Sequence, residues 1–189
     1  MKAGRLIRIA AIVIGLIALQ GLLVLTYLNV EKGRNAPADA VFRYERVPSR
    51  LAPDLTFALL DGSTGKLSEH RGHPVLLHFW ATWCPPCRDE LPSLLQLGSE
   101  LSVAGDLRII AVSLDTDWKE VRAFFEGSVP DEIVLDTSGA SQGSYDLSTL
   151  PDTYLISKDG MLRARFGGAR NWQSQPARDA VLAAIRQGP

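Results

Sequence analysis

The sequence predicts an α/β domain in which helices flank a central sheet of mixed strand direction, preceded by one transmembrane helix. Two observations support this class. From Leu51 onward, strand-like and helix-like segments alternate in the order β-α-β and then β-β-α, which is typical of a mixed sheet covered by helices. Ahead of them, residues 9–28 form a charge-free apolar run. With 189 residues, 46% of them hydrophobic, the chain can bury one core of ordinary size.

The apolar run, IAAIVIGLIALQGLLVLTYL at residues 9–28, has the length that a helix needs to cross about 30 Å of hydrocarbon. Because Lys2, Arg5 and Arg8 precede it, the positive-inside rule places the N-terminus in the cytoplasm and the remaining chain outside. A cleaved signal peptide is the alternative, and Ala38–Ala40 resembles its cleavage site, although it lies ten residues beyond the run. We favour an uncleaved signal-anchor.

The chain therefore divides into three expected parts. Residues 1–30 are the transmembrane anchor, residues 31–50 a tether, and residues 51–189 the folded domain. The tether is predicted because residues 31–50 mix charge, proline and alanine without any period. A flexible chain of this length reaches about 25 Å, so the domain is expected to work near the membrane surface.

Within the domain, four segments have the pattern of strands. Asp61-Gly62 predicts the turn of an N-terminal β-hairpin, and Asp159-Gly160 predicts a turn between two later strands. Two short apolar runs predict strands that are buried on both faces. The four segments are residues 55–68, 74–82, 107–115 and 153–168.

Three helices are predicted between and after these strands. Leucines at mostly helical spacing from Leu91 to Leu101 predict the first, directly after a pair of cysteines. Asp117 and Glu120 form a capping pattern that opens the second. Residues 175–188 carry the periodicity of the third.

Both cysteines of the chain lie in one motif, FWATWCPPCRDELP at residues 79–92. We expect Cys84 at the N-terminal end of the following helix, where free backbone N–H groups and the helix dipole stabilise an anion. The thiolate is the reactive species in thiol exchange, so this position favours Cys84 as the nucleophile and the more shielded Cys87 as the resolving thiol. Pro85 and Pro86 fix φ and hold the two sulfurs near bonding geometry.

Other interpretations of the pair are weaker. A structural disulfide is possible in an exported domain, but a four-residue ring constrains the unfolded chain little. A metal site needs more soft ligands, and His70, His73 and His78 lack the spacing to supply them. The net charge of -1 and the lack of basic runs with interleaved aromatics argue against nucleic-acid binding. We therefore predict a redox-active disulfide with no metal and no cofactor.

The motif at residues 79–92 resembles the active site of the thioredoxin superfamily, and in particular its membrane-anchored bacterial branch of TlpA-, ResA- and CcmG-like (DsbE) thiol-disulfide oxidoreductases. The resemblance extends from about Ala52 to Gly188 and includes the hairpin segment and the stretch LPDTYLISKDG from Leu150. It implies a thioredoxin fold with an added N-terminal β-hairpin and a central insertion.

The resemblance also implies roles for individual residues. Cys84 matches the attacking cysteine, Cys87 the resolving one, Trp83 the tryptophan before the pair, and Pro151 a cis-proline beside the disulfide. Glu90 matches an acid kept near the pair by ResA-like proteins. One helical turn past Cys87, it could relay a proton to or from that thiol, and an exposed helix-surface carboxylate is the alternative.

Two residues depart from the pattern. His78 occupies a strand position where thioredoxins have a buried Asp and many TlpA-like proteins have an Asn. A hydrogen-bonded core histidine and a proton shuttle are its two interpretations. Asp152, directly after Pro151, is expected to place a negative charge near the substrate groove, where it would raise the pKa of Cys84 if the two were close.

The expected function is that of an extracytoplasmic protein disulfide reductase on the bacterial inner membrane, facing the periplasm or cell exterior. The resemblance implies substrate protein disulfides, such as the CXXCH cysteines of apocytochrome c during cytochrome c-type biogenesis, and a membrane thiol reductase of the DsbD or CcdA type as electron donor. The alternatives are a disulfide-forming oxidant, a general repair reductase, a peroxiredoxin-like peroxidase and a tethered copper chaperone.

Overall fold

The computed structural model describes residues 15, 18–24, 44–102 and 107–186, and the chain divides into two compact units, Met1–Ala40 and Val41–Pro189. In the first unit, residues 15 and 18–24 are helical. Within the described ranges, no helix has the length and apolar character that a membrane span requires. Most of the predicted membrane segment, residues 9–28, lies outside the described residues, so the anchor stays a prediction.

In its described part, the second unit forms an eight-stranded sheet with the order β1-β8-β7-β4-β5-β6-β2-β3. Strands β4, β5 and β6 are parallel to one another, and the other neighbours are antiparallel, which confirms the predicted mixed sheet. The strands are β1 (Glu45–Arg46), β2 (Thr56–Ala58), β3 (Thr64–Lys66), β4 (Val75–Trp80), β5 (Arg108–Ser113), β6 (Ile133–Leu135), β7 (Asp152–Ile156) and β8 (Leu162–Gly167).

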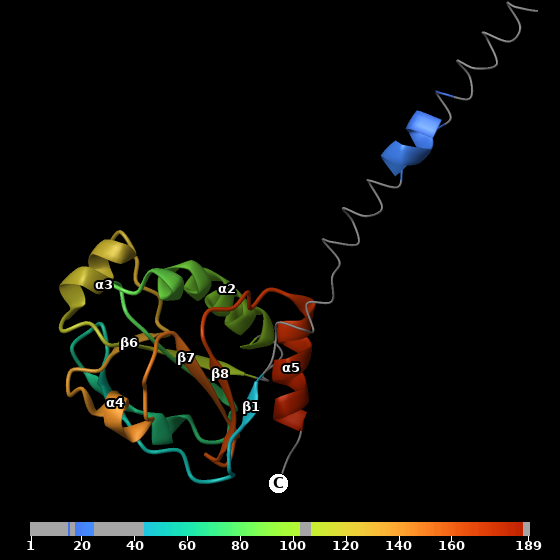
Figure 1. The fold of residues 1–189 in the computed structure, drawn as a ribbon. Coiled ribbons are helices and arrows are strands. Elements are labelled where there is room, and N and C mark those ends of the chain that lie inside the picture. The colour runs from blue at the N-terminus through green and yellow to red at the C-terminus, as the bar shows by residue number, and fades with distance from the viewer. Residues whose placement is uncertain (1–14, 16–17, 25–43, 103–106, 187–189) are drawn as a thin grey trace, which may run out of the picture. The chain divides into compact units, whose positions relative to one another are not determined.

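Helices cover both faces of this sheet (Figure 1). One face is covered by α2 (Pro85–Ser102), α3 (Trp118–Phe124) and α5 (Gln175–Arg186), and each of these helices contributes buried side chains to the same core cluster. We call this face the α2 face. The opposite face packs against η2 (Leu67–His70) and α4 (Ala140–Ser144), and its cluster includes Leu67 and Tyr145.

Strand β4 lies near the centre of the sheet, and all six of its residues are buried. Successive side chains of a strand point to opposite faces. Accordingly, Leu76 and Trp80 belong to the cluster of the α2 face, and Leu77 and Phe79 belong to the other cluster. His78 has the same parity as Leu76 and Trp80, so this polar ring points toward α2.

Helix α2 packs closely against strand β5. Gly98 faces Ile109 at such short range that any Cβ at position 98 would overlap the isoleucine side chain. The same buried side of α2 carries Cys87, Glu90 and Leu91. The packing that seats α2 on the sheet therefore also buries the sulfur of Cys87 and the carboxyl group of Glu90.

Local signals in the sequence are confirmed where they predict a turn or a cap. Strands β2 and β3 form the predicted hairpin, with Gly62 at φ 87°, a value that favours glycine. Asp61 accepts a hydrogen bond from the Ser63 N–H at 2.8 Å and stabilises this turn. Asp117 is the N-cap of α3, and its carboxylate accepts from the Lys119 N–H.

Four short elements were not predicted, one of them the four-residue helix η2, which begins where the hairpin segment was expected to continue. Strand β6 has three residues, α4 has five, and β1 has two residues that pair with β8. Tyr44, just before β1, packs on Phe166 with ring centroids 5.4 Å apart. The described part of the expected tether, residues 44–50, therefore belongs to the folded unit. Such short strands gain their stability from the strands with which they pair. They are too short to show an alternating hydrophobic pattern in the sequence.

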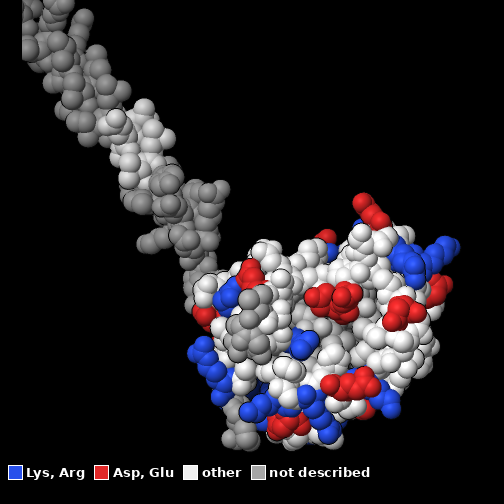
Figure 2. All heavy atoms as spheres, turned by 180° about the vertical axis from the view of Figure 1, so that it is seen from behind, with Lys and Arg blue, Asp and Glu red and all other residues white. Residues whose placement is uncertain are grey.

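Charges of both signs are mixed on one face of the protein. On the face drawn in Figure 2, Lys and Arg side chains are interspersed with Asp and Glu, and neither sign forms a continuous patch. This face therefore lacks the single-sign field that attracts a polyanion.

Candidate active site

Cys84 and Cys87 form a disulfide with an S–S distance of 2.03 Å and a Cα–Cα distance of 5.3 Å. Helix α2 begins at Pro85, so Cys84 directly precedes its first turn, as predicted. The Cys84 carbonyl accepts hydrogen bonds from the N–H groups of Cys87 and Arg88 at 3.1 and 3.2 Å. Pro85 and Pro86 occupy the first two helical positions, where a missing N–H costs no intrahelical bond.

The loop that carries Cys84 is held by a buried carboxylate. Asp115, 4% exposed, accepts hydrogen bonds from the Thr82 N–H at 3.0 Å and the Thr82 hydroxyl at 2.7 Å. It also accepts a hydrogen bond from the Ser113 hydroxyl at 2.6 Å. Asp115 thus ties the residues before Cys84 to the end of β5.

Only one of the two sulfur-bearing residues opens to a groove. Cys84 is 5% exposed, whereas Cys87 is fully buried. A groove of about 470 Å³ lies at Cys84, and all of its lining residues are uncharged. Trp83, which is 65% exposed, forms part of its wall. The remaining lining residues are Pro85, Leu114, Gln142, Leu147, Ser148, Thr149 and Leu150.

The loop before β7 forms another wall of this groove. The peptide bond between Leu150 and Pro151 is cis, which confirms the conformation that the resemblance implies. Pro151 is buried, and its carbonyl accepts a hydrogen bond from the Gly168 N–H at 2.9 Å. Leu150 lines the groove together with Cys84, so this loop and the disulfide share one surface.

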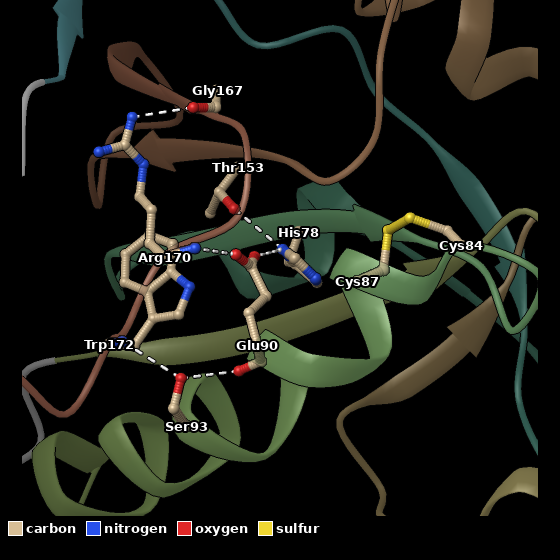
Figure 3. Close-up of polar contacts among 9 residues, drawn as sticks. All are labelled: His78, Cys84, Cys87, Glu90, Ser93, Thr153, Gly167, Arg170 and Trp172. Atoms are coloured by element: carbon tan, nitrogen blue, oxygen red, sulfur yellow. Dashed lines mark hydrogen bonds and ion pairs between the residues drawn. A yellow bond between two sulfur atoms is a disulfide. The ribbon is translucent and has the colours of Figure 1, made fainter. Parts of the chain in front are cut away.

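Glu90 points into the protein from the second turn of α2 (Figure 3). It is 3% exposed, so the alternative of an exposed helix-surface carboxylate is wrong. Its Oε2 accepts the backbone N–H of Arg170, and its Oε1 lies 3.6 Å from the Nδ1 of His78. Burial raises the pKa of Glu90 to about 7, against the opposing effects of the Arg170 N–H, the Trp172 side chain and the Arg170 charge.

His78 lies next to Glu90 on the α2 face. Its side chain is fully buried, and its Nδ1 lies 2.9 Å from the hydroxyl oxygen of Thr153 on β7. Burial lowers the pKa of His78 to about 3, so the imidazole is neutral at physiological pH. His78 is therefore a core histidine, as one of its two interpretations predicted, and its Nδ1 is the ring nitrogen that lies within hydrogen-bond distance of Thr153.

Asp152 does not border the groove, contrary to our expectation. It is 1% exposed and is held by Arg165, whose Nε lies 3.0 and 3.1 Å from the two carboxylate oxygens. A terminal nitrogen of Arg165 approaches one of these oxygens at 2.7 Å. Thr153 points to the α2 face, so its neighbour Asp152 points to the opposite face. Because successive side chains of β7 point to opposite faces, the carboxylate of Asp152 lies on the face of the sheet away from α2 and its cysteines.

Several site residues were missed at the level of sequence. Asp115, Thr153, Arg170 and the groove residue Leu114 contact the site from segments far from the cysteine motif. Thr153 follows the predicted cis-proline by two positions and could have been noted for that reason. Among the described residues, no three His, Cys, Asp or Glu side chains cluster so as to bind a metal.

Comparison with known sequences places the chain in a family. The AhpC/TSA family matches residues 48–165. The chain is 31% identical to the thiol-disulfide oxidoreductase ResA of Geobacillus kaustophilus over 163 residues, which cover 86% of this chain and 87% of that protein. It is 36% identical to the thioredoxin-like protein YneN of Bacillus subtilis over 118 residues, covering 59% of this chain and 66% of YneN.

Solved structures agree with this placement. A crystal structure from Chlorobium tepidum that carries the name thiol:disulfide interchange protein DsbE is 29% identical, with a TM-score of 0.65, and the match covers 75% of this chain and 99% of that one. The thioredoxin domain of a Bacteroides vulgatus thiol-disulfide oxidoreductase shares the fold at 23% identity, with a TM-score of 0.63 and coverage of 74% and 99%. The chain therefore belongs to the AhpC/TSA family of thioredoxin-like proteins, and groups there with thiol-disulfide oxidoreductases of the ResA and DsbE type.

Proposed function

We propose that this protein is a thiol-disulfide oxidoreductase that reduces disulfides of substrate proteins on the outer side of the bacterial inner membrane. The observation that carries the proposal is the Cys84–Cys87 disulfide at the start of α2, with only Cys84 opening to an uncharged groove. A reduced Cys84 at this position is stabilised as a thiolate by the N-terminal end of the helix.

The proposed reaction has two exchange steps. The Cys84 thiolate attacks one sulfur of a substrate disulfide, so that a mixed disulfide forms and the other substrate sulfur leaves as a thiolate. Cys87 then loses its proton and attacks the Cys84 sulfur, which closes the Cys84–Cys87 bond and releases the second substrate thiolate. Two electrons pass from the protein dithiol to the substrate, whose thiolates take protons from solvent.

Glu90 is the proposed acceptor of the proton that Cys87 loses. A general base works best when its pKa lies near the working pH. The pKa of Glu90, raised to about 7 by burial, meets this condition, and its carboxyl group lies on the same buried side of α2 as Cys87. A shielded thiol without such an acceptor would ionise only slowly.

The direction, location and partners are proposed together. An anchor at residues 9–28 would hold the domain outside the membrane, in a compartment where thiols need a reductant. Membrane thiol reductases of the DsbD or CcdA type would supply the electrons. The CXXCH cysteines of apocytochrome c are the proposed substrates, because haem attachment requires both thiols to be free.

Two measurements test this proposal. Cys87→Ala should trap a mixed disulfide with a substrate protein, and Cys84→Ala should not. The reduction potential of the domain should lie near that of thioredoxin, about -270 mV. A potential near that of DsbA, about -120 mV, would instead identify a disulfide-forming oxidant. Equal trapping by both variants would contradict the assignment of Cys84 as the nucleophile.

A further inference from the structure

His78 is a buried, titratable residue near the disulfide. Only one of the two nitrogens of its imidazole ring has a hydrogen-bond partner within the described part of the chain. Its Nδ1 lies 2.9 Å from the Thr153 hydroxyl oxygen, but its Nε2 has no hydrogen-bond partner among the residues that the structure describes. Nearly all buried polar atoms in folded proteins have a partner. A fully buried imidazole with one unpaired nitrogen therefore needs a reason.

The position of the ring supplies that reason. The Nδ1 side faces α2, where the Glu90 Oε1 lies 3.6 Å away. Figure 3 shows the imidazole between the Glu90 carboxyl group and Cys87, with its Nε2 edge turned toward the cysteine. A neutral imidazole can accept a proton at one nitrogen while it donates from the other.

We infer that His78 is the proton relay between Cys87 and Glu90 in the resolving step. The inference deepens the proposed oxidoreductase function and rests on it. Cys87 is fully buried, so its thiol proton cannot pass directly to solvent. His78 gives this proton a path to Glu90. His78 is the one side chain in Figure 3 that faces both groups.

The transfer balances without any further reactant. The Cys87 thiol gives its proton to Nε2 of His78, and the proton on Nδ1 passes to the Glu90 carboxylate. The Cys87 thiolate then attacks the Cys84 sulfur, the Cys84–Cys87 bond forms, and the bond from Cys84 to the substrate breaks. When a donor later reduces the disulfide, the same path runs backward and returns the proton to Cys87.

The surroundings of the ring favour a concerted transfer. Because burial lowers the pKa of His78 to about 3, the doubly protonated ring is disfavoured, and this favours loss of one proton as the other arrives. Glu90 takes up protons near neutral pH and lies next to Nδ1. The Thr153 hydroxyl both donates and accepts, so it can pair with Nδ1 in either tautomer.

The titratable groups around this path come from two elements besides β4. Helix α2 contributes Cys87 and Glu90, and the segment before α5 contributes Arg170, whose N–H binds Glu90 and whose guanidinium donates to the Gly167 carbonyl at 2.9 Å. From β7, the uncharged Thr153 faces the ring. Glu90 therefore sets the pH dependence of the relay.

Ellman's reagent separates the two steps of the reaction. Attack by Cys84 of the reduced protein releases one thionitrobenzoate, and resolution by Cys87 releases a second, so two phases of absorbance follow. We compare wild type with His78→Gln, which keeps a polar side chain of similar reach but does not titrate. His73→Gln is the matched control, because His73 is exposed and outside the site.

We expect His78→Gln to slow the second phase at least about tenfold while the first phase persists. The second phase of wild type should rise with pH near the pKa of Glu90, about 7, and the variant should lose this rise. His73→Gln should match wild type in both phases. An unchanged second phase in His78→Gln overturns the relay alone. Absence of a first phase in wild type instead overturns the proposed function.

A second variant and a spectroscopic measurement cover the case in which His78→Gln does not fold. Thr153→Val removes the hydroxyl that orients the ring, and we expect it to slow the second phase about threefold or more. Nitrogen NMR of wild type reports the tautomer directly. The relay predicts Nε2–H in the oxidised protein and Nδ1–H in the reduced protein, and one tautomer in both states overturns it.

Discussion

Glu90 and Asp152 are both buried carboxyl groups, yet they lie on opposite faces of the sheet in opposite surroundings. Asp152, 1% exposed, is held by Arg165 through N–O contacts of 2.7 to 3.1 Å. Glu90, 3% exposed, accepts a backbone N–H from Arg170 and lies 3.6 Å from a neutral imidazole. The two acids are equally shielded from water and differ in their partners.

The difference in partners gives Asp152 a structural role and leaves Glu90 suited to proton transfer. The bidentate guanidinium of Arg165 compensates the charge of Asp152 and ties β7 to β8. Glu90 is surrounded mainly by neutral dipoles, so burial dominates and its pKa rises to about 7. Glu90, three residues after Cys87, is therefore poised to exchange a proton near neutral pH.

The largest expected effect comes from leaving Asp152 without its partner. Arg165→Met should lower the free energy of unfolding by about 3–5 kcal/mol, because it strands a buried carboxylate. Urea unfolding measures the change. The matched control is Arg178→Met, which breaks a more exposed pair with Glu100 and should cost about 0–1 kcal/mol. Equal losses in the two variants would show that Asp152 is not dependent on Arg165.

The next effect is the pH dependence that Glu90 adds to stability. Between pH 4.5 and about 7, the folded protein binds a proton at Glu90 that the unfolded chain does not bind, since the pKa is raised from 4.5 to about 7. The contribution of Glu90 to the free energy of unfolding therefore falls by about 3 kcal/mol as pH rises through this window. Glu90→Gln should remove this loss, as measured by urea unfolding of the oxidised protein at pH 5 and pH 8.

His78 provides the internal control for that measurement, because its contribution has the opposite sign. Its pKa is lowered from 6.5 to about 3, so below pH 6.5 the unfolded chain binds a proton that the folded protein excludes. Stability from His78 is therefore lost as pH falls from 6.5 toward 3. In wild type the two contributions oppose each other between pH 4.5 and 6.5. In Glu90→Gln stability should fall with acid relative to wild type, and parallel pH curves for the two proteins would contradict the burial of Glu90.

The smallest expected effect is that of Asp152 on the chemistry. Asp152→Asn should change the rate of the second thionitrobenzoate release by less than about twofold per folded molecule, because its side chain lies on the face away from the thiols. Glu90→Gln should slow the same phase at least about tenfold. A slower second phase in Asp152→Asn than in Glu90→Gln would exchange the roles of the two acids.

Much of the fold follows from local patterns. The apolar runs that became β4 and β5 are short and continuous because both faces of these strands are covered, and the Asp-Gly turn and the Asp117 cap act within a few residues. The short strands β1 and β6 have no such pattern. Their pairing with β8 and with β5 is made over long sequence distances, so they become visible only in the folded sheet.

The candidate site likewise has some features that follow from local sequence and others that depend on tertiary packing. The placement of Cys84 before the first turn of α2, and the two prolines after it, depend on one turn of helix and were predicted from the motif. The burial of Glu90 depends on which side of α2 meets the sheet. The location of Asp152 depends on the phase of β7, and a shift by one residue would have turned it toward α2.

By itself, the sequence determined that two cysteines lie one helical turn apart at the start of a helix on a mixed sheet, because spacing, capping and alternation act over a few residues. Only the tertiary structure decided that His78, Thr153 and the Arg170 N–H surround Glu90. These contacts join β4, β7, α2 and the segment before α5. The physical reason is that desolvation and hydrogen bonding are set by every element packed around a group, so the pKa of a buried acid is a property of the fold.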